Sequence, residues 1–155
     1  RWRESIVHPI AYDVNPPFRE LAVIAAAQSA DVADLEWTDA VSRSVDAVAG
    51  LTAVDGATII TDAHELLAFG AKIGRRDGGT QVDNVVMTEP VEGDVAVTVH
   101  PGQVGGTRHL SAAQFVQDQP ESIAMVASQD GRFTIFAWSP CAQRVYAHRV
   151  EVLLM

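Results

Sequence analysis

The apolar residues between positions 51 and 155 fall in short runs ended by turn-forming residues, and this spacing restricts the chain to a sheet-based fold. Apolar runs of about four to eight residues, bounded by glycine, proline or aspartate, are typical of buried or half-buried strands. Residues 66–69 could instead form a helical turn. We predict strands over 57–61, 66–73, 82–88, 95–100, 123–128, 133–138 and 144–154.

Three segments have helical rather than strand character. Residues 18–30 are rich in alanine, and residues 39–49 carry a valine stripe with Asp39 as a candidate cap and Gly50 as a candidate stop. A third helix is predicted over 107–118, whereas the segments predicted to be irregular are 1–17, 31–38, 74–80 and 102–106. Strands and helices in this order predict the α/β class, a mixed central β-sheet flanked by helices.

Length and charge narrow the protein class. A chain of 155 residues with 48% hydrophobic residues predicts one folded domain, with residues 1–50 as lead-in and helical cover and residues 51–155 as the core. The net charge of −9 argues against a surface that binds duplex DNA, because phosphate neutralisation needs a basic stripe. No apolar stretch approaches the roughly 20 residues of a membrane helix. The lone Cys141 excludes a disulfide framework and predicts a reducing compartment, the cytoplasm.

The segment Gly105-Gly106-Thr107-Arg108-His109 is the strongest candidate for a binding site. Glycines let the backbone approach a ligand closely, and the start of a helix directs free amides and positive dipole at it. Arginine presents a fork of donors that matches phosphate, and threonine and histidine can add hydrogen bonds. The alternative is an ordinary glycine loop, a helix capped by Thr107 and exposed polar residues without a ligand.

Three further regions carry weaker signals. Asp55-Gly56-Ala57 precedes a predicted strand, where an acid could hold a divalent cation, although Asp-Gly is also a frequent turn pair. Residues 128–131 (Ser-Gln-Asp-Gly) suit a hairpin turn without any function. Lys72, Arg75 and Arg76 gather in one region and could attract a polyphosphate, or simply be solvated.

Several common kinds of site are not indicated by any motif. His8, His64, His100 and His148 lack metal-ligand spacing, and the HExxH sequence of zinc proteases is missing. The chain also has no GxSxG elbow and no Walker loop. Zinc, serine-hydrolase and P-loop chemistry are therefore not predicted.

Taken in order, the motifs resemble those of the diadenylate cyclase domain family. The matching segments are Asp55-Gly56-Ala57, a strand pair reaching Gly70, residues 106–113 (GTRHLSAA) and residues 126–131 (VASQDG), which together span a little over half of the chain. The family has a mixed central sheet wrapped by helices and condenses two ATP molecules into cyclic di-AMP with Mg²⁺ or Mn²⁺. Its product is two-fold symmetric, so the resemblance implies a face-to-face homodimer.

The resemblance also assigns roles to individual residues. Asp55 would bind the metal and help to activate the attacking 3′-hydroxyl, and the phosphates would be held by Thr107, Arg108 and His109. The remaining nucleotide-binding positions that it implies are Gly56, Ala57, Gly70, Gly106, Ser128 and Asp130.

The chain departs from the family pattern in two places. Leu110 stands where the family has a second arginine, and Gln129-Asp130 stands where paired glutamates are usual. Loss of these charges favours a nucleotide-binding sensor or regulatory domain that binds ATP or a cyclic di-AMP-type nucleotide and is weak or inactive as a cyclase. The alternatives are an active diadenylate cyclase, since Asp55, Arg108 and His109 are present, and a scaffold or interaction domain without a ligand.

Overall fold

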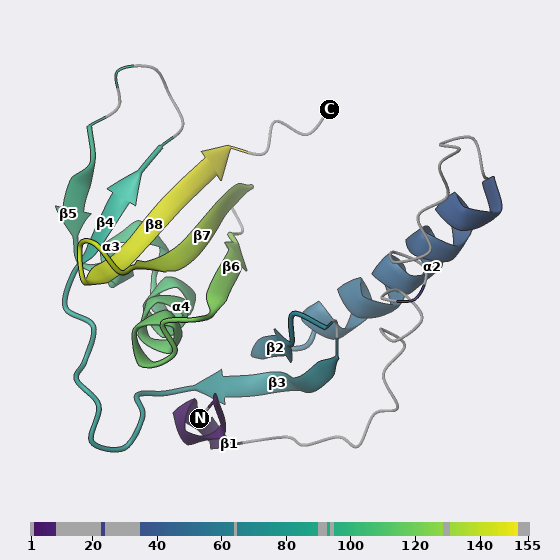
Figure 1. Ribbon diagram of the computed structural model, residues 1–155, viewed down its shortest axis with the longest axis horizontal. Helices are drawn as coiled ribbons and strands as arrows, with labels where there is room; N and C mark the ends of the chain where they lie inside the picture. Colours follow the sequence, from purple (N-terminus) through teal and green to yellow (C-terminus); the bar gives the residue numbers. More distant parts are fainter. Residues whose placement is uncertain are drawn as a thin grey trace. The chain divides into compact units, whose positions relative to one another are not determined.

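The computed structural model describes residues 2–8, 23, 35–63, 65–89, 93, 95–128 and 131–151 (Figure 1). The chain divides into two compact units, Val7–Lys72 and a second unit formed by Arg1–Ile6 with Ile73–Met155. Strands and helices build a mixed α/β structure with two open sheets, one of three strands and one of five. The predicted mixed α/β class is therefore confirmed, with two sheets in the described residues.

The described part of the unit Val7–Lys72 contains a long helix and most of a small sheet. The helix is α2 (Leu35–Thr52), and β2 (Ala57–Ile60) follows it closely along the chain. In the three-stranded sheet, β3 (Leu66–Ile73) lies between β2 and β1 (Ile6–His8). The prediction of a strand over residues 66–73 is confirmed, and the helical alternative for 66–69 is wrong.

The second unit is built on the five-stranded sheet. Its strands are β4 (Val85–Thr88), β5 (Val97–Val99), β6 (Ile123–Ala127), β7 (Arg132–Ser139) and β8 (Arg144–Glu151). The strand order is β5-β4-β8-β7-β6. The neighbours β4 and β8 are parallel, and the other three neighbouring pairs are antiparallel. The helices described in this unit are η1 (Trp2–Ser5, a 3-10 helix), α3 (Pro101–Gly105) and α4 (Thr107–Asp118).

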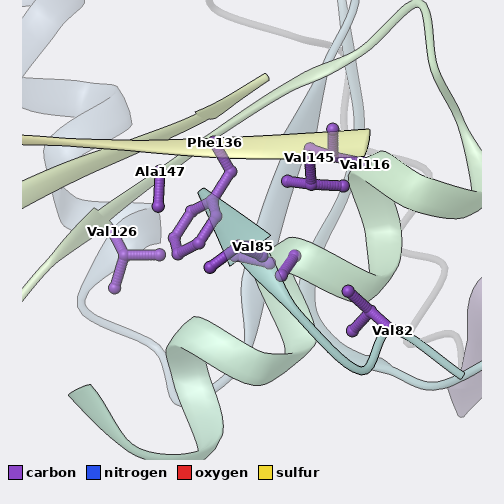
Figure 2. Close-up of a cluster of buried hydrophobic side chains, with 9 residues drawn as sticks. Val82, Val85, Val116, Val126, Phe136, Val145 and Ala147 are labelled. Carbon is purple, nitrogen blue, oxygen red and sulfur yellow. The ribbon is translucent and has the colours of Figure 1, made fainter. Parts of the chain in front are cut away.

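Helix α4 and the sheet share one hydrophobic core. Figure 2 shows Val85, Phe136 and Val145 of the sheet together with Val116 of α4, and the side chain of Phe136 is fully buried. Apolar side chains of this size each gain about 1.5–3 kcal/mol when they leave water. The core therefore fixes α4 on the sheet. Its buried members are Val82, Val85, Ala112, Ala113, Val116, Val126, Phe136, Val145 and Ala147.

Three predicted segments differ from the structure. Residues 102–106 do not form a loop, because His100 accepts a hydrogen bond from the Gly102 amide and Pro101 occupies the first turn, which together start α3. Helix α2 begins at Leu35, within the segment predicted as a loop over 31–38, and it continues past Gly50 to Thr52. The lead-in predicted to be irregular contains η1 and β1.

Other predicted helices and strands agree more closely. Helix α4 has the predicted bounds, and the strands over 57–61, 123–128 and 133–138 match within a residue at each end. The strands over 82–88 and 95–100 are shorter than predicted. The predicted helix over 18–30, apart from Val23, the turn residues 129 and 130, and residues 152–154 of the last predicted strand lie outside the described residues.

Polar side chains of α4 anchor the segment that precedes β4. Buried Gln114 accepts from the Val82 amide at 2.9 Å and donates to Thr80 O at 3.1 Å and to Asp118 Oδ2 at 3.1 Å. Asp118 Oδ2 also accepts from the Arg76 amide at 2.9 Å. These bonds satisfy polar groups that the packing of α4 has removed from water.

Replacing Gln114 tests this anchoring. Gln114→Ala leaves the buried Val82 amide without its acceptor, so the free energy of unfolding should fall by about 1–3 kcal/mol. Gln117→Ala is the matched control, because Gln117 bonds to Thr80 in an exposed position and its loss should cost less than about 0.5 kcal/mol. Urea unfolding measures both changes, and equal losses would contradict the anchoring.

Candidate functional site

The junction between α3 and α4 presents the start of a helix to solvent. Gly106 ends α3 and caps α4 with φ 80° and ψ −154°, a backbone conformation that is open essentially to glycine alone. Its amide donates to Gly102 O at 2.9 Å. Thr107 and Arg108 follow in the first turn of α4, and both are exposed. The sequence prediction that glycine, threonine and arginine meet at a helix start is confirmed.

His109 lies in the interior of its unit, although the resemblance assigns it to phosphate. The residue is 2% exposed, and its ring meets the Phe136 ring edge-on with centroids 5.9 Å apart. Nδ1 lies 2.9 Å from Gly105 O, and since a carbonyl only accepts, Nδ1 donates. Nε2 lies 3.3 Å from the hydroxyl of Thr134 on β7. Both ring nitrogens thus have protein neighbours in this conformation.

Gly105 is explained by the same imidazole. A Cβ atom at position 105 would overlap the ring of His109, so no larger residue fits without displacing that ring. Glycine is therefore needed at the two positions for different reasons. Gly105 leaves room for the His109 ring, and Gly106 adopts a backbone conformation with positive φ.

The Asp55 segment belongs to the unit Val7–Lys72, together with Ala57 and Gly70. Gly56 has φ 125°, and a Cβ there would overlap the backbone of Gly70. This glycine pair permits close approach between two chain segments, so contact within the protein is sufficient to explain Gly56. The side chain of Asp55 is exposed and forms an ion pair with Lys72 of β3.

A resident metal ion does not fit the donors around Asp55. Among the residues that the structure describes, no three histidine, cysteine, aspartate or glutamate side chains gather closely enough to hold a metal ion. A cation at Asp55 would also have to compete with the ammonium group of Lys72. The described His, Cys, Asp and Glu side chains therefore form no preformed three-ligand group for a metal ion.

The remaining predicted positions are distributed as follows. Ser128 is half-buried, and its amide donates to Arg132 O at 2.8 Å where the β6–β7 hairpin closes; Asp130 lies outside the described residues. Leu110 packs against the hydrophobic core. Gly106, Thr107, Arg108 and Ser128 belong to one unit, whereas Asp55, Gly56, Ala57 and Gly70 belong to the other.

Sequence reasoning missed a charged residue that contacts the junction. Arg149 of β8 donates to Val104 O at 3.1 Å and to Glu89 at 3.0 Å. The available signal was an arginine within a predicted strand, since a half-buried strand seldom holds an unpaired charge.

Comparison with known proteins found no match to any family model, curated protein or solved structure. Within the described residues, no helix has the length and apolar character needed to span a bilayer.

The contact between Gly56 and Gly70 yields a stability prediction. Gly56→Ala combines a positive φ with an overlap against backbone atoms, so we expect a loss of at least about 1–3 kcal/mol. Gly50→Ala is the control, because no atom lies within 4 Å of its Cβ position in α2 and helical alanine should stabilise by about 0.4–1 kcal/mol. Thermal unfolding measures both, and shifts in the same direction would contradict this explanation.

Proposed function

We propose that this protein is a nucleotide-binding regulatory domain of the diadenylate cyclase type. It recognises the phosphates of ATP or a cyclic di-AMP-type nucleotide at the start of α4. The observation that carries the proposal is the exposed sequence Gly106-Thr107-Arg108 at the first turn of a 12-residue helix.

The chemistry of this turn suits an anion. The first amides of an α-helix have no partners within the helix, and the aligned peptide dipoles place partial positive charge at that end. The space beside Gly106 is open, because no atom lies within 4 Å of the point where a Cβ would stand. Thr107 adds a hydroxyl, and Arg108 adds a charged fork that can bind two phosphate oxygens.

A regulatory role is better supported than a catalytic one. Leu110, which replaces the second arginine of the family motif, packs against the core and offers no charge to a transition state. Asp55 forms an ion pair with Lys72, and a catalytic cation would have to displace that ammonium group. Binding without turnover is the behaviour that these residues support.

Calorimetric titration with ATP and with cyclic di-AMP tests the binding proposal. Arg108→Ala should weaken binding about 10- to 150-fold, the equivalent of one charge-assisted hydrogen bond. Arg144→Ala is the control: it removes an exposed arginine that donates to the nearby Ala142 O, and it should leave the dissociation constant within about twofold. If both substitutions raise the dissociation constant equally, the nucleotide is held by nonspecific charge attraction and the proposed site is wrong.

Turnover is tested by incubating the protein with ATP and Mn²⁺ and measuring cyclic di-AMP and pyrophosphate. We expect neither product to accumulate, because the charges that the family motif places after the histidine and serine are missing at Leu110 and Gln129. Cyclic di-AMP formation that Asp55→Asn abolishes would instead identify an active cyclase and overturn the regulatory assignment.

A further inference from the structure

One pair of side chains on the sheet reaches both sides of the α3–α4 junction. Thr134 of β7 and Arg149 of β8 are direct cross-strand partners. Directly opposite residues of an antiparallel pair have Cβ atoms about 4.5–5.5 Å apart and point to the same face. Thr134 contacts His109 of α4, and Arg149 contacts Val104 of α3. This one cross-strand pair therefore contacts both the end of α3 and the start of α4.

Arg149 is held in a defined orientation. Its side chain is 14% exposed, with Nη1 donating to Glu89 Oε1 at 3.0 Å and Nη2 donating to Val104 O at 3.1 Å. The planar guanidinium can make both bonds at once, whereas a lysine ammonium cannot reproduce that fork. Glu89 thereby orients the guanidinium that binds the last turn of α3.

The second support acts on the next carbonyl. Gly105 O accepts from His109 Nδ1 at 2.9 Å, while His109 Nε2 lies 3.3 Å from the Thr134 hydroxyl. Two successive carbonyls, those of Val104 and Gly105, are thus each bound by a side chain. These bonds fix the peptide units that directly precede Gly106 and the first amides of α4.

We propose that Arg149, oriented by Glu89, is a positioning residue for the phosphate-binding turn at Gly106, Thr107 and Arg108. This inference rests on the proposed nucleotide-binding function. Arg149 holds the Val104 carbonyl, so that the amides after Gly106 are already directed at the phosphates before the nucleotide arrives. Preorganisation of this kind raises affinity because the bound geometry need not be ordered during binding.

Two conservative substitutions distinguish a positioning role of Arg149 from a purely electrostatic effect on binding. Calorimetry measures the dissociation constants of ATP and cyclic di-AMP for each variant. Glu89→Gln removes a negative charge, so a long-range field alone would tighten the binding of an anionic nucleotide. Positioning predicts the opposite sign, a dissociation constant raised about 3- to 30-fold. Arg149→Lys keeps the charge, and positioning again predicts weakening by about 3- to 30-fold.

A double-mutant cycle completes the test. If Glu89 acts through Arg149, the combined variant should bind no more than about twofold more weakly than the weaker single variant. Thermal unfolding of each variant shows that it is folded, and either folded single variant suffices for the decision.

The outcomes distinguish this inference from the proposed function. Wild-type protein that binds neither ATP nor cyclic di-AMP overturns the proposed function, and this inference with it. Wild-type binding that Glu89→Gln strengthens or leaves unchanged, or that Arg149→Lys leaves unchanged, overturns the positioning role alone. Weakening of binding by either folded single variant supports the positioning role, and weakening by both without additivity shows that Glu89 acts through Arg149.

Discussion

The buried imidazole of His109 is the contact on which the arrangement of the α3–α4 junction depends. It binds the carbonyl of Gly105 in its own segment and lies against Thr134 and Phe136 of β7. A buried polar ring is stable only when its nitrogens have partners, because an unpaired one costs about 1–3 kcal/mol. The need to satisfy this ring therefore ties the start of α4 to the sheet and requires a glycine at position 105.

This arrangement gives neighbouring residues of one motif separate tasks. His109 faces the interior and supports the turn, whereas Thr107 and Arg108 remain exposed at its surface. In the proposed function, the exposed residues bind phosphate and the buried residue maintains the backbone that presents them. Specific recognition needs both, since a turn without support would have to be ordered by the ligand at a cost in affinity.

Local patterns predicted much of the fold, and long-range contacts explain the rest. The bounds of β3 and α4 follow from the lengths of their patterns and from nearby glycines. Helix α3 was missed because Gly102, Gly105 and Gly106 argue against a helix, yet the cap at His100 and Pro101 overrides that preference. At the candidate site, the exposed Thr107 and Arg108 were predictable from local sequence. The contacts of Arg149 and Gly70 were not, because they depend on residues distant along the chain.

The shared role of Gly106 as the end of one helix and the cap of the next makes the length of this junction as important as its composition. Each residue of an α-helix turns the chain by about 100°. An insertion of one amino acid between His109 and Ala112 would therefore either move His109 from its buried place to the exposed place of Arg108 or carry Ala112 and Val116 out of the core. This segment should therefore tolerate exchanges of exposed side chains better than changes in chain length.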